Sequence, residues 1–250
     1  MTPSIRIFPT AKRAAVHAAA EIARVLRRRG RPIVYLASGK TMVPVYGELV
    51  RMHRAGRVSF RRVRTFNLDE LAVGPEDPRS FRSFMDRHLL SRVDFDPRHA
   101  GYLRGDAPNL DAEAACYERA LQRAGRADLA IVGIGTNGHV AYLEPGRSVA
   151  PSTSLVELSA RTRRVLAADG LRPVPRRALT MGIETILSAR EILLVATCRA
   201  KAAAVAEALE GPVSPRCPAS FLSLHPRLIV VLDRAGAARL AGKETVAKKR

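Results

Sequence analysis

Short apolar segments alternate with longer amphipathic segments along the whole chain. The apolar segments predict strands at SIRIF (4–8), PIVYLAS (32–38), RVRTFNLD (62–69), DLAIVGIG (128–135), EILLVAT (191–197) and RLIVVLD (227–233). Most of these runs are apolar at nearly every position, which is typical of strands buried on both faces of a parallel sheet.

Between these segments, apolar residues recur at the spacing of an amphipathic helix. This spacing predicts helices over residues 10–30, 43–54, 78–90, 109–125, 176–189 and 199–211. Thr10 is placed to cap the first helix and Gly30 to end it. Regular strand–helix alternation predicts an α/β fold, a Rossmann-like parallel sheet flanked by helices on both faces.

The chain has 250 residues, of which 47% are hydrophobic, and we expect one globular domain over residues 1–250. The most loop-like interior stretch, GLRPVPRRA (170–178), is either a mobile flap or a connector. No apolar run reaches the ~20 residues that a membrane helix needs. The N-terminus has the pattern of a strand and a helix rather than of a signal peptide, so we expect a cytoplasmic protein with no membrane partner.

The net charge of +19 favours either nucleic-acid binding or an arginine-rich composition spread over solvated helices. Basic residues are dispersed apart from RVLRRRGR (24–31) and KETVAKKR (243–250), and aromatic residues do not interleave with these runs. We therefore expect no specific nucleic-acid partner. An anionic substrate would also be attracted by this field.

Three cysteines, Cys116, Cys198 and Cys217, lack the CxxC spacing of a metal or redox site. They fit buried free thiols in a reducing compartment. The histidines lack the spacing of a metal site as well. The residue pattern thus predicts no metal.

Three predicted strands end in residues that carry chemistry: LASGKT (36–41), FNLDE (66–70) and GIGTNGH (133–139). Ligands of open α/β sheets bind beyond the carboxyl ends of the strands. We therefore expect these three ends to line one crevice.

A phosphate site is predicted at the first of these ends, with Ser38, Gly39, Lys40 and Thr41 as its residues. Backbone N–H groups of such a turn cradle an anion, and the two hydroxyl groups add donors. Val34 stands where a nucleotide-binding P-loop needs glycine. An ordinary strand-to-helix turn is the alternative. Lys201 is a second candidate for the same phosphate, unless it is a solvated lysine.

The second end places Asp69 and Glu70 side by side. Neighbouring residues of a strand point to opposite faces, so the pair serves one substrate atom only if the strand has already ended. Asp69 is a candidate base for a proton next to a carbonyl group. The alternative is a carboxylate pair that caps a helix or binds arginines.

The third end places His139 after Gly133, Gly135 and Gly138, with Glu144 five residues later. The glycine spacing differs from a dinucleotide fingerprint. His139 is a candidate general acid or base, and Glu144 is placed to accept a hydrogen bond from its ring. A structural histidine after a turn is the alternative.

Four segments, FNLDE, GIGTNGHVAYLEPG, RMHRAGRVSF and ALTMGIETILSA, resemble glucosamine-6-phosphate deaminases (also called isomerases) in register from about residue 30 to 235. The 6-phosphogluconolactonases are related and share the fold. The resemblance implies a Rossmann-like enzyme that opens the sugar ring, moves a proton between C2 and C1 and releases ammonia to give fructose 6-phosphate. It implies a sugar-phosphate partner and neither a redox cofactor nor a metal.

The resemblance also implies a role for each matched residue. Asp69 would remove the C2 proton, and His139 would transfer a proton at the ring oxygen, oriented by Glu144. Asn137 stands where family members carry aspartate or asparagine, and it could only position or hydrogen-bond. The phosphate would rest on Ser38, Gly39, Thr41 and Lys201.

Several positions depart from the family pattern. The phosphate turn lacks the usual proline and gains Lys40, and Leu143 replaces an amide. The family's flap arginine would align near Ala168 in a connector about three residues shorter, so Arg172 or Lys40 is a possible substitute. Residues 152–155 do not match the family's allosteric site, so that activation is not predicted. Family members are monomers or hexamers, which leaves a homo-oligomer open.

Two other functions stay open from the sequence. One is a lactonase acting on a sugar-acid phosphate, against which FNLDE argues. The other is a sugar-phosphate-sensing module of a DNA-binding regulator. Such regulators carry an N-terminal helix-turn-helix, and here the first predicted strand starts by Ser4.

Overall fold

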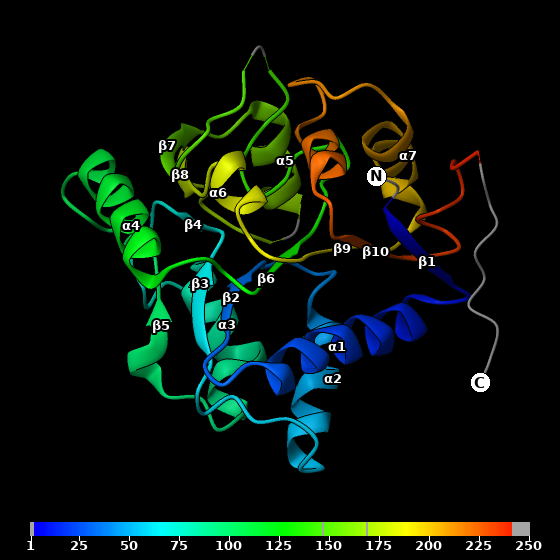
Figure 1. The fold of residues 1–250 in the computed structure, drawn as a ribbon. Helices are drawn as coiled ribbons and strands as arrows, with labels where there is room; N and C mark the ends of the chain where they lie inside the picture. Colours follow the sequence, from blue (N-terminus) through cyan, green and yellow to red (C-terminus); the bar gives the residue numbers. More distant parts are fainter. Residues whose placement is uncertain (1–2, 147, 169, 242–250) are drawn as a thin grey trace.

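A seven-stranded parallel sheet forms the centre of the molecule (Figure 1). The computed structural model of the chain describes residues 3–146, 148–168 and 170–241. The strand order is β1-β10-β9-β6-β2-β3-β5, and all paired neighbours run parallel. The bounds are β1 Ser4–Phe8, β2 Ile33–Leu36, β3 Arg64–Asn67, β5 Ala100–Gly101, β6 Leu129–Val132, β9 Ile192–Ala196 and β10 Leu228–Asp233.

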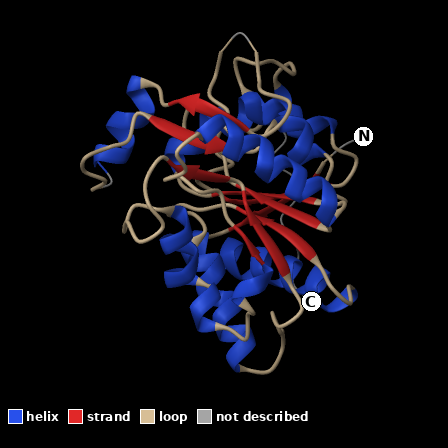
Figure 2. Ribbon diagram, turned by 90° about the vertical axis from the view of Figure 1, so that its left-hand side faces the viewer, coloured by secondary structure: helices blue, strands red, loops and turns tan. Residues whose placement is uncertain are grey.

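Helices cover both faces of this sheet, as Figures 1 and 2 show. Helices α1 and α2 pack against each other on one face with α3 beside them, and α4, α6 and α7 lie on the other. The bounds are α1 Ala11–Arg28, α2 Val43–Arg54, α3 Phe81–His88, α4 Leu110–Ala124, α5 Ala160–Ala168, α6 Ile183–Leu187 and α7 Ala202–Glu210. Short 3₁₀ helices are η1 Leu90–Arg92, η2 Pro97–His99, η3 Arg199–Lys201 and η4 Pro218–Leu224. The predicted α/β fold is confirmed.

Helix α1 illustrates why these residues form these elements. The side chain of Thr10 accepts a hydrogen bond from the backbone N–H of Arg13, which is the predicted N-cap. One face of α1 is buried and rich in alanine, which lets the helix lie close to the sheet. The helix ends at Arg28, shortly before Gly30.

A second, antiparallel sheet with the order β4-β8-β7 was not expected from the sequence. Its strands are β4 Asp69–Leu71, β8 Arg177–Thr180 and β7 Ser154–Glu157. Asp69 pairs with Thr180, which in turn pairs with Ser154. Asp69 therefore lies on a strand of the small sheet rather than at the end of the central one.

Two predicted elements are corrected by this sheet. The single strand over 62–69 is wrong, because pairing with β2 stops at Asn67 and residue 69 joins the small sheet. The single helix over 176–189 is wrong as well, because residues 177–180 pair with strands on both sides and only Ile183–Leu187 is helical. Tertiary pairing overrides the local helical spacing here. Segment 170–176 connects α5 to β8.

Other expectations concern the cysteines and the termini. All three thiols are free, but only Cys217 is buried, so the prediction of buried thiols is wrong for Cys116 and Cys198. The basic run 243–250 lies outside the described residues. Within the described part of the chain, no helix is both long and apolar enough to cross a membrane.

Gly182, between β8 and α6, provides a test of the small sheet's packing. A Cβ atom there would lie 2.2 Å from the carbonyl carbon and oxygen of Pro151. We predict that Gly182→Ala lowers the free energy of unfolding by about 2 kcal/mol, the usual cost of overpacking. Gly47→Ala, in the open interior of α2, is the control and should raise stability by roughly 1 kcal/mol. Urea unfolding measures the free energy of unfolding of both variants. Equal changes in the two variants would contradict the packing described.

Candidate active site

The chemistry-bearing segments follow four adjacent strands of the central sheet. In the order β9-β6-β2-β3, these strands are followed by Lys201, the segment 133–144, the turn 38–41 and Asp69. The connection after β2 leads to β3 on one side, and the connection after β6 leads to β9 on the other, so a topological switch point lies between β2 and β6. Ligands of such sheets bind at this crevice. The expected convergence of the strand ends is therefore supported by the strand order.

The turn 38–41 connects β2 to α2. Gly39 has a φ of +106°, a left-handed conformation that glycine adopts without strain, and its carbonyl oxygen accepts a hydrogen bond from Met42 N–H at 2.9 Å. No side chain caps α2. Ser38 and Thr41 are half-buried in the turn, whereas Lys40 is exposed. The turn and the N-terminus of α2 thus present donors suited to an anion.

Lys201 reaches this turn from β9. Its Nζ donates to Thr41 Oγ1 at 2.7 Å, although 160 residues separate the two in sequence. Lys201 therefore lies where a shared phosphate site would require it. Burial lowers the pKa of Lys201. An ammonium group with little water around it gains more from an arriving anion than an exposed lysine would.

The backbone before Lys201 is held in an unusual conformation. Cys198 has a φ of +78°, which is rare for a residue with a side chain. Its N–H donates to Asp233 Oδ1 at 3.1 Å, at the end of the neighbouring strand β10. Asp233 therefore fixes the bend that directs η3 and Lys201 toward the turn.

Asp69 and Glu70 have different environments. Glu70 accepts hydrogen bonds from the backbone N–H groups of Leu71, Phe81 and Arg82 and from the Ser80 hydroxyl, so it holds the start of α3. Burial raises its pKa, against the effect of these donors. The helix-capping alternative is thus correct for Glu70, and the pair does not share one task.

Asp69 has no such partners. It is 7% exposed, and its Oδ1 is buried without a hydrogen bond among the described residues. Burial raises its pKa to about 8, and the nearby Glu70 carboxylate adds to the shift. A buried carboxyl group that titrates near neutral pH is suited to proton transfer.

Three buried tyrosines lie within electrostatic range of Asp69: Tyr46 from α2, Tyr117 from α4 and Tyr142 from the segment after β6. Burial raises the pKa of each, and the Asp69 charge adds to the effect. The hydroxyl groups of Tyr46 and Tyr117 donate to the carbonyl oxygens of Ala37 and Asn67. These two hydroxyl groups are therefore used by the backbone rather than by Asp69.

The segment after β6 folds into consecutive tight turns. Gly138 N–H donates to the Gly135 carbonyl oxygen at 3.0 Å, and Gly135 N–H donates to that of His139 at 2.9 Å. A Cβ atom on Gly135 would lie 2.3 Å from His139 Cε1, and Gly138 has a φ of +87°. The two glycines are therefore required for the imidazole to lie across this turn.

Glu144 is held by three donors. Its Oε2 accepts from Asn137 Nδ2 at 2.9 Å, and its Oε1 accepts from the hydroxyl groups of Ser159 at 3.2 Å and Thr162. Nδ1 of His139 is buried without a hydrogen-bond partner in the described part of the chain. The contact expected between Glu144 and the imidazole is thus replaced by contacts with the start of α5.

His139 is nonetheless within electrostatic range of the other site residues. Burial lowers its pKa, the Glu144 carboxylate raises it, and Lys201 and Arg161 lower it. The net lowering keeps the imidazole neutral near pH 7, with one nitrogen free to donate and one to accept. His139, Glu144 and Lys201 thus belong to one site.

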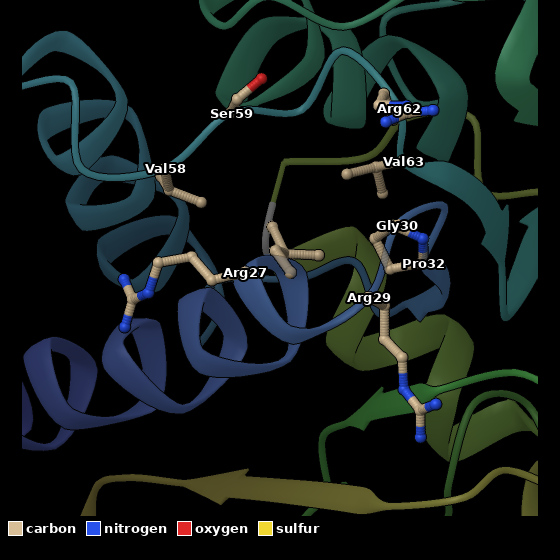
Figure 3. Close-up of a pocket in the computed structure, with 9 residues that line it drawn as sticks. Arg27, Arg29, Gly30, Pro32, Val58, Ser59, Arg62 and Val63 are labelled. Atoms are coloured by element: carbon tan, nitrogen blue, oxygen red, sulfur yellow. The ribbon is translucent and has the colours of Figure 1, made fainter.

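Two hollows lie apart from this site. Figure 3 shows one of about 170 Å³ between the end of α1 and residues 58–63, with the guanidinium groups of Arg27 and Arg29 pointing in different directions. It lies at the amino ends of β2 and β3, opposite the crevice. A hollow of about 750 Å³ lies between α4 and α6. None of the predicted site residues lines either.

Several residues of the site were missed by the sequence interpretation. Ser159 and Thr162 hold Glu144, Tyr142 lies within electrostatic range of both Asp69 and Glu144, and Asp233 fixes the turn before Lys201. A serine before a helical run is an N-cap signal, so Ser159 could have been found. The others depend on tertiary contacts.

The chain is a Rossmann-like α/β protein whose strand ends lead to a glycine turn contacted by a lysine, to a buried carboxyl group and to a histidine. The chain belongs to the glucosamine-6-phosphate isomerases/6-phosphogluconolactonase family, whose model matches residues 9–230.

Individual relatives and solved structures are similar to this chain over most of its length. A glucosamine-6-phosphate deaminase of Rhodopirellula baltica is 41% identical, over 94% of this chain and 95% of its own. One of Bacillus velezensis is 42% identical, over 88% of this chain and 92% of its own. The solved structure of a monomeric glucosamine-6-phosphate deaminase is 35% identical, covers 94% of this chain and 99% of its own, and has a TM-score of 0.91. A Thermotoga maritima 6-phosphogluconolactonase shares the fold, with a TM-score of 0.75 at 21% identity, over 93% of this chain and 99% of its own.

The environment of Asp69 predicts a pH-dependent stability. Its ordinary pKa is 3.8 and its folded value is about 8, so between these values the folded chain holds a proton that the unfolded chain has released. The stability of the wild type should therefore fall as pH rises through this window. We predict that Asp69→Asn raises Tm at pH 8 and raises it much less at pH 5. Calorimetric scans of both proteins at both pH values check this. A difference in Tm between the two proteins that is the same at both pH values would contradict it.

Proposed function

We propose that this protein is a glucosamine-6-phosphate deaminase, converting glucosamine 6-phosphate and water into fructose 6-phosphate and ammonia. One observation carries the proposal: a buried carboxyl group, Asp69, and a neutral His139 follow the two strands that flank β2, and Lys201 contacts the turn that follows β2. The relatives at about 40% identity bear the same activity in their names.

The phosphate group would bind at Ser38, Gly39, Lys40, Thr41 and Lys201. Lys201 supplies the charge, and the backbone of the turn supplies N–H donors. A sugar anchored there by its 6-phosphate extends its C1–C2 end into the rest of the crevice. The high positive charge of the chain favours the approach of this anionic substrate.

Ring opening requires a proton to move from the C1 hydroxyl group to the ring oxygen. A neutral imidazole can accept the first proton and deliver one to the second atom, and burial keeps His139 neutral. Glu144 stabilises the imidazolium form that arises in between, because its charge raises the pKa of His139. The side chain of Asn137 donates to Glu144 and accepts a hydrogen bond from the backbone N–H of His139, so it links the two residues.

Isomerisation then moves the C2 proton to C1. In the empty site, burial favours the protonated form of Asp69. The amine-derived cation at C2 of the bound substrate favours the carboxylate instead, because an opposite charge nearby stabilises the ionised form. Asp69 thereby becomes a base when the substrate is in place, takes the proton from C2 and delivers it to C1, while one proton of the ammonium group ends on the C1 oxygen and leaves an iminium at C2. Water then replaces the nitrogen at C2, and ammonia leaves.

The two alternatives have less support. A lactonase needs no base at C2, so the isolated environment of Asp69 favours the deaminase. The sensing module also needs no proton-transfer groups. We further propose that the protein acts in the cytoplasm, where the free thiols of Cys116, Cys198 and Cys217 would stay reduced.

The proposal is tested by ammonia release. We expect the wild type to release ammonia from glucosamine 6-phosphate, His139→Ala to abolish most of the activity, and Asp69→Asn to lower kcat by more than ~10², the range of general-base contributions. A coupled assay measures ammonia, and 6-phosphogluconolactone is tested in parallel. No turnover above the His139→Ala background would refute the function, and turnover of the lactone alone would favour the lactonase.

Lys201→Met tests the phosphate site. The phosphate group does not change during the reaction. If Lys201 binds it, removal of the lysine side chain weakens binding of the ground state and of the transition state equally. We expect KM to rise at least ~10-fold with kcat within a factor of about three. Lys12→Met, on the exposed side of α1, is the control for loss of charge. A fall in kcat at constant KM would contradict this role.

A further inference from the structure

The start of helix α5 contributes two hydroxyl groups to Glu144. Ser159 precedes the helix, and Thr162 lies in its first turn. Both donate to the same oxygen, Oε1, and Asn137 Nδ2 donates to Oε2. Of the three side chains that hold Glu144, two therefore come from outside the segment 133–144.

The local geometry orients these hydroxyl groups. Ser159 Oγ accepts a hydrogen bond from Thr162 N–H at 3.1 Å, the arrangement of a helix N-cap. With its lone pair used in this way, the hydroxyl hydrogen of Ser159 is directed to Glu144. Thr162 is 6% exposed, so its hydroxyl group has little access to water and depends on the carboxylate as acceptor. The positive end of the helix adds to the attraction.

A small apolar cluster fixes α5 to the segment after β6. Tyr142 and Leu158 are buried in this cluster, and Leu166 of α5 packs against it. The Tyr142 ring also stacks on Phe81 at 5.9 Å between centroids. Since Tyr142 lies two residues before Glu144, α5 holds this part of the site both by packing and by hydrogen bonds.

We propose that Ser159 and Thr162 are positioning residues that hold the Glu144 carboxylate in place beside His139, making the first turn of α5 part of the ring-opening machinery. The inference rests on the proposed function, because it acts through the role given to Glu144. Neither hydroxyl group needs to touch the substrate. Their effect is to fix a negative charge next to the imidazole during proton transfer.

Thr162→Val is the decisive variant, because it keeps the size and branching of the side chain and removes only the donor. We expect kcat to fall by ~10-fold, the factor for one hydrogen bond to a charged group, with KM within a factor of about two. Thr162→Ser should restore kcat. Val165 is exposed on the same helix, and Val165→Ala should change neither kcat nor KM. Ser159→Ala should also lower kcat, and it should lower Tm as well because the helix loses its N-cap.

A second readout is independent of turnover. The groups that set the charge of His139 are Glu144, which raises its pKa, and Lys201 and Arg161, which lower it. NMR titration of the imidazole, at a temperature where both proteins are folded, should give a lower pKa in Thr162→Val than in the wild type, shifted toward that of Glu144→Gln. Val165→Ala should titrate like the wild type.

The outcomes separate the two proposals. If the wild type releases no ammonia, the proposed function fails, while the titration still decides whether Thr162 holds the carboxylate near His139. If Thr162→Val keeps both kcat and the His139 pKa of the wild type, the positioning role is overturned. A loss of kcat that follows a loss of Tm and is not restored by Thr162→Ser overturns it as well.

Discussion

The main chain of Leu68 joins the two sheets, and the arrangement of the site depends on it. Its N–H donates to the Leu36 carbonyl oxygen at the end of β2, and its carbonyl oxygen accepts from Met181 N–H just after β8. Leu36 leads into the turn 38–41, and Asp69 follows Leu68. Two backbone hydrogen bonds therefore set the position of Asp69 relative to this turn, and the side chain of Leu68, 1% exposed, locks this junction in the core.

The same junction explains the electrostatic character of Asp69. A residue passing between two sheets is buried, and Asp69 is 7% exposed. Folding leaves this carboxyl group without the donors that Glu70 receives from the start of α3. The fold thus accepts a stability penalty at one carboxyl group and satisfies its neighbour, and the penalised group is the one that we propose as the base.

The sequence predicted the central sheet well because its strands are continuous apolar runs with parallel neighbours. It also predicted that SGKT, Lys201 and the segment around His139 belong together, because carboxyl ends of parallel strands share an edge. It did not predict β7 and β8, since their pairing joins Ser154 and Thr180 across 25 intervening residues and local spacing at 176–189 favours a helix. The partners of Glu144 were missed for the same reason: Ser159 and Thr162 reach it through that small sheet and α5.

Asn137 shows how the contacts constrain the chemistry. Its Nδ2 donates to Glu144, and its Oδ1 accepts a hydrogen bond from the backbone N–H of His139, so both ends of the amide have a partner. An aspartate here would place two carboxylates in contact and force one of them to hold a proton. With asparagine, Glu144 stays an acceptor for three neutral donors, and position 137 supplies no second acid beside it. In the mechanism we propose, the proton that opens the ring then passes through His139, and the hold of α5 on Glu144 influences the charge of that imidazole.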